Sequence, residues 1–356
     1  MNVSIYKGAA TSSERETASE RFRYSLSGWM HRVVREIHDM TTTTVSTPLV
    51  RLGNLFPERE VYAKCEFLSP SGSFKDRGAA HLLTRLSQSE GNRLLVVPSM
   101  GNTALGAAVA AKKFGFSMVG VVPQTISRAK DEKLQALGVE LIKVAGGGTD
   151  LLNRATQVAQ ERNGYFVHPH LDSNWTDGYQ VIAEEIMRGL PSCRTLVFPV
   201  GGGGLLMGLT EYFLRQASGA CERPGTKPQA GAVLSPRRSH APLAIVGCEA
   251  YNYPTYAKFD HSRTKTIADG LVLEVPHPKV QERINALKIP IHLVQDSAIR
   301  EAMRDLYRTQ GMLVEPSSAV TVAYVKEYLG TLEEPICTVM TGDNITREDC
   351  FGLIAE

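Results

Sequence analysis

The chain has 356 residues, of which 43% are hydrophobic and 21% charged, as in an ordinary globular protein. Its 39 Lys and Arg residues nearly balance its 37 Asp and Glu residues, and a net charge of +2 gives no strong field to attract nucleic acid or an anionic membrane. The chain has no apolar run near the roughly 20 residues of a membrane span, and its start lacks a signal-peptide core. We therefore expect a cytoplasmic protein without nucleic-acid or membrane partners.

The first elements are a polar arm and one helix. Residues 1–20 are rich in Ser, Thr, Glu and Arg, which favours a loose N-terminal arm. Leu26, Met30, Val33 and Ile37 then recur at helical spacing. This helix either packs on its own domain or contributes to a contact between two copies of the chain.

From residue 60 onward, short apolar runs rich in β-branched residues alternate with amphipathic stretches. This alternation predicts mainly parallel sheets covered by helices. A Pro- and Gly-rich segment without apolar periodicity predicts a surface insertion at 218–242. The predicted strands are 61–67, 94–98, 118–122, 140–144, 165–167, 195–200, 244–248 and 336–340, and the predicted helices include 102–114, 129–137, 149–162 and 204–216.

Lys75 lies in the loop 69–78, between a predicted strand and a helix. Ligands of α/β sheets bind where strands end in such loops. The positive end of the helix dipole disfavours a protonated lysine, and a neutral amine is what a Schiff-base lysine needs. The alternative is an exposed, solvated lysine.

Two further loops have compositions that favour anions. The loop 99–103 (Ser-Met-Gly-Asn-Thr) offers backbone N–H groups and hydroxyls at a helix start, which suits a carboxylate, although Ser99 or Asn102 could be a plain N-cap. The glycines at 201–204 allow the backbone to fold around a compact phosphate. Lys-Ser/Thr does not follow, so a nucleoside-triphosphate loop is not expected.

A lysine, a phosphate loop and a carboxylate loop are the parts that a pyridoxal-phosphate enzyme requires. Residues 71–79 (Ser-Gly-Ser-Phe-Lys-Asp-Arg-Gly-Ala) and the two anion loops resemble the tryptophan-synthase β-like family, also called fold type II. The similarity covers about residues 45–350 in family order. It includes Thr-Pro-Leu at 47–49, Thr-Ile-Ala-Asp-Gly at 266–270, Glu-Pro-Ser-Ser-Ala at 315–319 and Thr-Gly-Asp-Asn at 341–344.

The resemblance implies a two-domain α/β fold of mainly parallel twisted sheets with helices on both faces. We expect a small α/β domain at 94–171. The large cofactor domain is then formed by residues 1–93, with the N-terminal arm, and 172–356, with the insertion. We also expect a homodimer.

The resemblance also assigns roles to residues, with pyridoxal 5′-phosphate as the cofactor. Lys75 is expected to form the Schiff base and to move the substrate Cα proton. The other expected cofactor-binding residues are Phe74, Asn102, Gly201, Gly202, Gly203, Gly204, Leu205 and Thr341. The expected substrate-binding residues are Ser99, Met100, Gly101, Thr103 and His170. Asp343, two residues after Thr341, is expected to point away from the cofactor.

Within the family, the tetraglycine loop and Thr-Ile-Ala-Asp-Gly resemble threonine/serine dehydratases and serine racemases. Met100 stands where racemases present an acid–base serine, and a thioether cannot move protons. We therefore expect a lyase that eliminates the β-substituent of a serine- or threonine-like L-amino acid and yields a 2-oxo acid and ammonia. Thr103 replaces the usual dehydratase His, which leaves β-replacement or a threonine-synthase-like reaction open. Intact Lys75 and Thr341 argue against a binding protein without turnover.

Histidines and cysteines are the remaining candidates for metal ligands. His168, His170 and Asp172 lie close in sequence, but the family often has His-Pro-Phe-Asp here, which makes His168 structural and leaves His170 facing the cofactor or the substrate. The six cysteines are scattered without a Cys-x-x-Cys pair. We expect no metal and reduced cysteines.

Overall fold

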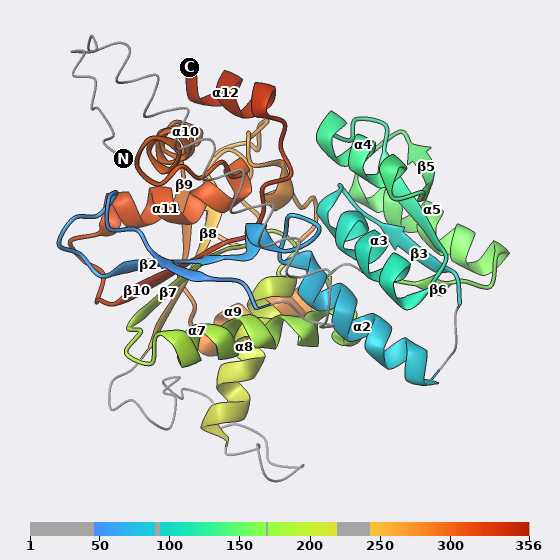
Figure 1. Cartoon of the computed structure of the whole chain (residues 1–356), viewed down its shortest axis with the longest axis horizontal. Helices are drawn as coiled ribbons and strands as arrows, with labels where there is room; N and C mark the ends of the chain where they lie inside the picture. Colours follow the sequence, from blue (N-terminus) through green and yellow to red (C-terminus); the bar gives the residue numbers. More distant parts are fainter. Residues whose placement is uncertain (1–45, 90–92, 169, 219–242, 356) are drawn as a thin grey trace, which may run out of the picture.

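The computed structural model describes residues 46–89, 93–168, 170–218 and 243–355. The predicted N-terminal arm, the helix predicted around 26–37 and positions 219–242 of the predicted insertion lie outside these residues. The described chain forms two α/β bodies that lie side by side, one on a 6-stranded sheet and one on a 4-stranded sheet (Figure 1). The predicted α/β fold class is confirmed.

The larger sheet has the strand order β1-β2-β10-β7-β8-β9. Every neighbouring pair is parallel except β1 and β2. Because parallel strands end at the same edge, the loops after β2, β10 and β7 emerge side by side. The strands are β1 Leu49–Arg51, β2 Val61–Cys65, β7 Thr195–Pro199, β8 Ala244–Ala250, β9 Ile291–Val294 and β10 Ile336–Met340.

The smaller sheet is entirely parallel and has the order β5-β4-β3-β6. Its strands are β3 Leu95–Pro98, β4 Met118–Pro123, β5 Glu140–Val144 and β6 Tyr165–Phe166. All four lie between the boundaries expected for the small domain. The division at 94 and 171 itself stays a proposal.

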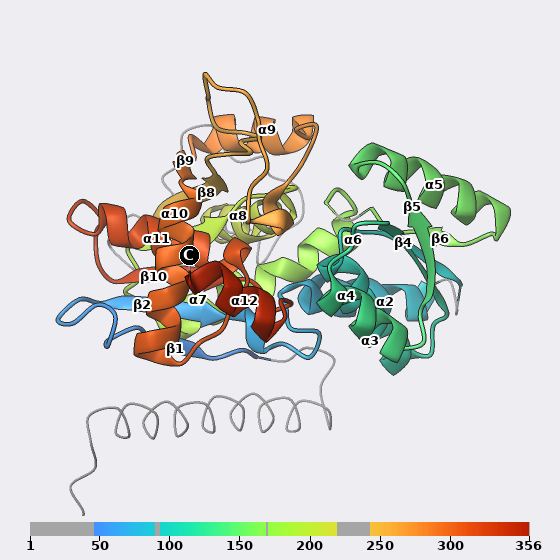
Figure 2. The same cartoon turned by 90° about the horizontal axis from the view of Figure 1, so that it is seen from above.

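Helices cover both faces of both sheets (Figures 1 and 2). In the larger body, α10 and α11 lie on one face of the sheet, and α7 and α8 lie on the other (Figure 1). The helices are α2 Lys75–Ser89, α3 Asn102–Phe114, α4 Arg128–Ala136, α5 Gly148–Glu161, α6 Ser173–Thr176, α7 Gln180–Gly189, α8 Gly204–Ala217, α9 Pro278–Leu287, α10 Asp296–Asp305, α11 Pro316–Tyr328 and α12 Arg347–Ala355. Shorter turns are η1 Glu66–Leu68, η2 Asp177–Tyr179, η3 Asp269–Leu271 and η4 Leu306–Gln310.

Alternating side chains of the strands face two different cores. In β7, Val197 packs with residues of α10 and α11, whereas Leu196 and Phe198 pack with residues of α7 and α8. This period of two is the geometry of a strand buried on both faces. The core that contains Leu196 and Phe198 also contains residues of α2 and α3 and of β3, so it runs from one body into the other.

Three details differ from the sequence prediction. The strand predicted at 61–67 ends at Cys65, because the Glu66 carboxylate turns inward to Arg77 and the chain enters η1. The short strands β1 and β9 were not predicted. Each is only three or four residues long, and β9 carries the polar His292 within it.

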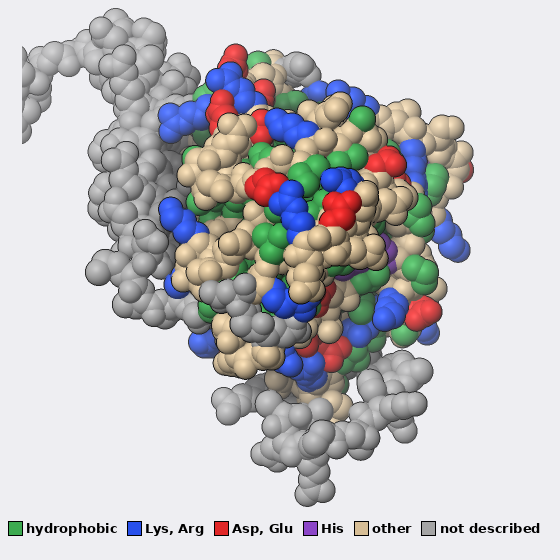
Figure 3. Space-filling view, turned by 90° about the vertical axis from the view of Figure 1, so that its right-hand side faces the viewer, with side chains coloured by type: hydrophobic (Ala, Val, Ile, Leu, Met, Phe, Trp, Pro, Cys, Tyr) green, Lys and Arg blue, Asp and Glu red, His purple; other side chains and the backbone are tan. Residues whose placement is uncertain are grey.

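The described surface and thiols show no sign of a membrane span or a disulfide. In the described part of the chain, no helix is long and apolar enough to cross a membrane. Acidic and basic side chains are interspersed on the face shown in Figure 3. The described cysteines are free and buried: Cys65, Cys193, Cys248, Cys337 and Cys350.

Candidate active site

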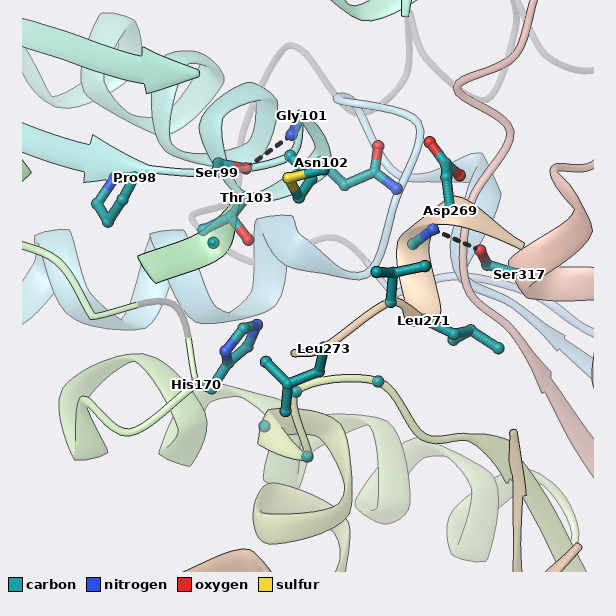
Figure 4. Close-up of a pocket in the computed structure, with 18 of the residues that line it drawn as sticks. Pro98, Ser99, Gly101, Asn102, Thr103, His170, Asp269, Leu271, Leu273 and Ser317 are labelled. Carbon is teal, nitrogen blue, oxygen red and sulfur yellow. Dashed lines mark hydrogen bonds between the residues drawn. The ribbon is translucent and has the colours of Figure 1, made fainter. Parts of the chain in front are cut away.

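A cavity of about 340 Å³ lies between the two bodies. The loop 98–103 of the small sheet lines one side, and Asp269, Leu271 and Leu273 line the other, with His170 nearby (Figure 4). The structure brings all the site residues predicted from the sequence to this cavity. They are Phe74, Lys75, Ser99, Met100, Gly101, Asn102, Thr103, His170, Gly201, Gly202, Gly203, Gly204, Leu205 and Thr341.

The loop that carries Lys75 is fastened to the segment after β10. The N–H of Phe74 donates to the carbonyl of Thr341 at 2.9 Å, and the N–H of Asp343 donates to the carbonyl of Gly72 at 3.0 Å. Gly72 has a φ of 80°, which suits glycine, and a Cβ there would lie 2.4 Å from Asp343 Oδ1. The Asp343 carboxylate thus lies under this loop, and Asp343 does not line the cavity.

The Lys75 amine lies in an apolar environment at the start of α2. Burial lowers its pKa to about 8, and the Glu315 carboxylate opposes this change. Its Nζ lies 4.7 Å from the centre of the Phe74 ring and 5.9 Å from that of Tyr179. A substantial fraction of the amine is therefore neutral at mildly alkaline pH, as a nucleophile requires.

A buried network of charges anchors the first turn of α2. The guanidinium of Arg77 donates to Glu66 at 2.9 Å and to Glu185 at 2.8 Å. Lys64 Nζ donates to Glu185 at 2.5 Å and to the Thr47 carbonyl at 2.5 Å. The side chains of Arg77, Glu66 and Lys64 are at most 1% exposed. Because α2 begins at Lys75, this network fixes the backbone that carries the amine.

The tetraglycine loop follows β7 and leads into α8. A Cβ at Gly201 would lie 2.9 Å from the Gly270 carbonyl, and one at Gly202 would lie 2.2 Å from the His170 ring. Gly203 has a φ of 83° and is the N-cap of α8. Side chains are excluded here, and the backbone N–H groups and the helix dipole favour an anion.

The side chain of Ser99 fixes the conformation of the loop 99–103 through two hydrogen bonds. Ser99 Oγ accepts hydrogen bonds from the N–H of Gly101 at 2.9 Å (Figure 4) and from that of Ala104 at 3.1 Å. The hydroxyl therefore caps α3 as well as lining the cavity. Gly101 has a φ of 138°, and a Cβ there would lie 2.3 Å from Lys130 Cδ.

A polar cluster that the sequence analysis did not assign lies beside Asn102. Asn102 Nδ2 donates to Glu315 Oε1 at 2.6 Å, and its Oδ1 accepts from Asn344 at 2.9 Å. Lys130 Nζ donates to Asp269 at 3.0 Å and lies 3.7 Å from Glu315. Asp269 and Glu315 fall within two of the quoted motifs, which could have signalled them, whereas nothing in the sequence around Lys130 did so.

Thr341 follows β10 and is buried. Its hydroxyl lies 3.3 Å from that of Ser318, which in turn donates to the Gly342 carbonyl at 2.7 Å. The Thr341 hydroxyl therefore offers the cavity an uncharged hydrogen-bonding group.

The histidines after β6 show no metal geometry. His168 Nδ1 accepts from the N–H of His170 at 3.3 Å and from that of Leu171 at 3.2 Å, which is a structural role. In the described part of the chain, no group of His, Cys, Asp or Glu residues is arranged to hold a metal ion. His277, which the sequence analysis did not single out, lies against His170 at the cavity.

In this α/β fold a buried lysine amine and a loop of glycines line one cavity, which is the arrangement expected of an enzyme that binds a phosphorylated compound through an amine. The residues fit pyridoxal phosphate, because the glycine loop excludes side chains where a phosphate would bind and the amine has a lowered pKa. A family model described as "Pyridoxal-phosphate dependent enzyme" matches residues 40–342. The chain belongs to this family, and pyridoxal phosphate is its cofactor.

Named relatives agree with the fold type II resemblance. The chain is 28% identical to an L-threonine ammonia-lyase of Thermotoga maritima, over 80% of this chain and 67% of the relative. It is 27% identical to an L-threonine dehydratase catabolic TdcB of Staphylococcus aureus, over 86% of each chain. The structure of the processed form of threonine deaminase isoform 2 from Solanum lycopersicum is similar in fold, with a TM-score of 0.73 at 22% identity, over 92% of this chain and 87% of that one.

Proposed function

We propose that this chain is a pyridoxal-phosphate-dependent ammonia-lyase that removes the β-substituent of a serine- or threonine-like L-amino acid and releases a 2-oxo acid and ammonia. One observation carries the proposal: Lys75, the tetraglycine loop and the loop 99–103 line a single cavity. The names of the relatives, an ammonia-lyase and a dehydratase of threonine, support the same reaction.

The cofactor site is assigned as follows. The bound cofactor supplies a ring that withdraws electrons from the substrate Cα. The N–H groups of Gly201–204 would hold the phosphate at the start of α8, where Leu205 follows, and Phe74 would border the ring. Asn102 Nδ2 carries two hydrogens, so it can donate one to Glu315 and one to the phenolic oxygen of the cofactor ring.

Thr341 would offer a neutral hydroxyl to the pyridine nitrogen of the bound cofactor. A hydroxyl supplies no negative charge, so the ring remains a weaker electron sink than it would be opposite an aspartate. This favours rapid loss of a β-leaving group over a long-lived carbanion.

Lys75 would take the Cα proton, since its amine lines the cavity and burial lowers its pKa to about 8. Ser99, Gly101 and Thr103 hold the substrate carboxylate, largely through backbone N–H groups at the start of α3. Met100 is 42% exposed at the cavity, and its thioether cannot return a proton to the opposite face of Cα. This supports elimination over racemisation.

The test combines chemical trapping with product analysis. Borohydride reduction of the holoenzyme, followed by peptide mass mapping, should place the cofactor on Lys75. In a separate experiment, the unreduced holoenzyme is incubated with a panel of L-amino acids that includes serine and threonine. It should release 2-oxo acid and ammonia in equal amounts from its substrate. Lys75→Ala should lose about 10²–10⁴-fold or more in turnover. The control Lys143→Ala, at a side chain 42% exposed on β5, should not.

Other outcomes separate the alternatives. A new amino acid that forms only when a nucleophile is added would replace elimination with β-replacement. Trapping of the cofactor without turnover across the panel would refute the lyase assignment.

We also propose domain boundaries at 94 and 171, a homodimer and a cytoplasmic location. The motif resemblance supports the first two, and the expectation from the sequence supports the third. Limited proteolysis, light scattering and cell fractionation test them in turn.

A further inference from the structure

Three histidines gather next to the tetraglycine loop. His168 and His170 follow β6, and His277 is the N-cap of α9. The ring centres of His170 and His277 lie 5.4 Å apart, and those of His168 and His277 lie 5.5 Å apart. Of these residues, His170 and His277 line the cavity.

His170 and His277 are hydrogen-bonded to each other. His170 Nδ1 lies 3.3 Å from His277 Nε2, so one of these nitrogens donates and the other accepts. A second hydrogen bond fixes His277, because its backbone N–H donates to the Tyr256 hydroxyl at 3.1 Å. The position of the pair is therefore set by β6 on one side and by α9 on the other.

One face of the His170 ring lies on the glycine loop. A Cβ built on Gly202 would lie 2.3 Å from both Cγ and Nε2 of His170 and 2.2 Å from Cδ2. The ring thus stacks on the backbone that is expected to hold the phosphate, and Nε2 is one of the three ring atoms nearest to the built Cβ. Glycine at 202 is what permits this contact.

Both imidazoles are neutral near pH 7. Burial first, and then the charge of Lys75, lower the pKa of His170 well below its ordinary value. Burial and the neighbouring His168 also lower the pKa of His277. A neutral pair shares a single hydrogen across its bond. Either His277 donates and His170 keeps its hydrogen on Nε2, or His170 donates from Nδ1 and its Nε2 carries no hydrogen.

The glycine loop decides between these two arrangements. Its N–H groups and the helix dipole favour an anion, and a bare Nε2 lone pair would repel that anion. An N–H at Nε2 adds a donor, and the hydrogen bond of the second ring nitrogen sets the tautomer of a histidine.

We propose that His277 donates to His170 Nδ1 and thereby fixes the tautomer in which His170 Nε2–H donates to the cofactor phosphate in the tetraglycine loop. His170 is then a phosphate-binding residue, and His277 is a positioning residue that acts through it. The inference rests on the cofactor site assigned above, and it does not depend on which amino acid is the substrate.

Binding of two matched probes to the apoprotein tests the inference without turnover. Pyridoxine 5′-phosphate cannot form an imine with Lys75, and pyridoxine lacks the phosphate. His170→Phe should weaken the phosphate probe about tenfold or more and leave pyridoxine unchanged. His277→Phe should weaken the phosphate probe similarly, and His277→Gln, whose amide can still donate, should restore most of the affinity.

Nitrogen NMR of the histidine-labelled holoenzyme measures the tautomer of His170 directly. The hydrogen of His170 is expected on Nε2 in the wild type and in His277→Gln, and is expected to redistribute in His277→Phe. If His170→Phe does not fold, as judged by its melting curve, the His277 variants still decide the question.

Two results would overturn the inference: a hydrogen on Nδ1 of His170, or equal affinity of the wild type and the folded variants for the phosphate probe. Either result leaves the lyase proposal standing, because trapping on Lys75 and product analysis test that proposal separately. Conversely, failure of the amino-acid panel does not affect the probe binding.

Discussion

The pKa of Lys75 links its burial to the pH dependence of cofactor attachment. Burial lowers this pKa to about 8, so the neutral fraction of the amine rises from about one-tenth at pH 7 to about nine-tenths at pH 9. The rate at which the apoprotein takes up pyridoxal phosphate should therefore rise about tenfold over this range and then level off. Stopped-flow absorbance measures it.

Glu315 provides a matched variant for this experiment. Its carboxylate raises the pKa of Lys75 against the effect of burial, so Glu315→Gln should move the midpoint to lower pH. A wild-type midpoint near the ordinary lysine value of about 10.5 would show that the amine is solvated instead.

Arg77 is the residue whose loss should most affect stability near the site. Arg77→Met removes the guanidinium that pairs with Glu66 and Glu185 and leaves Lys64 as their remaining cation, and breaking a buried pair costs about 3–5 kcal/mol. The free energy of unfolding in urea should fall by this amount. Arg154→Met removes an exposed pair with Glu161 and should change it by less than about 0.5 kcal/mol. Equal effects of the two variants would contradict the role of the network.

At the scale of elements, the strand-to-helix loop at 201–204 should not tolerate side chains. Gly203 has a φ of 83°, and a Cβ there would lie 2.4 Å from Val280 Cγ1. Gly203→Ala should lower stability by about 1–2 kcal/mol because of the left-handed backbone alone, and should weaken binding of pyridoxine 5′-phosphate. Gly352→Ala is the control, since α12 has open space there and alanine favours helices. Unchanged probe binding in Gly203→Ala would argue against phosphate in this loop.

The elements that end in the three loops could be predicted because their signals are local. An apolar run with β-branched residues precedes the loops 99–103 and 201–204, and glycines or hydroxyls follow it, as in Thr195–Pro199 before the tetraglycine. The strand before Lys75 has a weaker signal, since it includes Lys64, and it ends two residues earlier than predicted. The strands β1 and β9 lack such a signal, since they are short and Ile291–Val294 includes a histidine.

The partners within the site could not be predicted, because they lie far apart in the sequence. Asn102 and Glu315 are separated by 213 positions, and His170 and His277 by 107. Asn102 and His170 follow strands of the smaller sheet, whereas Glu315 and His277 are the N-caps of α11 and α9, and only the folded chain brings the two groups to one cavity. Local composition gave Lys75, the glycines and the carboxylate loop, but it carries no information on such contacts.

At the scale of the whole molecule, Glu274 connects the two bodies across the cavity. Its carboxylate accepts hydrogen bonds from the N–H of Gly148 at 3.1 Å and from the hydroxyl of Thr149 at 3.3 Å, both at the start of α5. A Cβ at Gly147 would lie 1.7 Å from Glu274 Oε1, so the approach requires glycine there. The negative charge also interacts favourably with the helix dipole.

Glu274→Gln should loosen this connection. Backbone amides at the start of α5 should exchange hydrogen about two- to fivefold faster, because a charge at a helix N-terminus contributes about 0.3–1 kcal/mol. Hydrogen-exchange mass spectrometry measures this. Glu161→Gln, at the last residue of the same helix, is the control and should leave those amides unchanged. Unaltered exchange in the Glu274 variant would show that the contact does not hold the bodies together.

The hydrophobic core that runs from α7 and α8 beneath the larger sheet into α2, α3 and β3 has a consequence for how the molecule melts. Each body buries part of its apolar surface against the other, so we expect the two bodies to unfold together. Calorimetry of the whole chain should show one endotherm, and a fragment of residues 94–171 should lack sharp dispersion in its proton spectrum. The cavity that Lys75 lines would then lie inside a single cooperative unit. Grafting the smaller body onto another scaffold would require new apolar contacts for the α3 residues of this core.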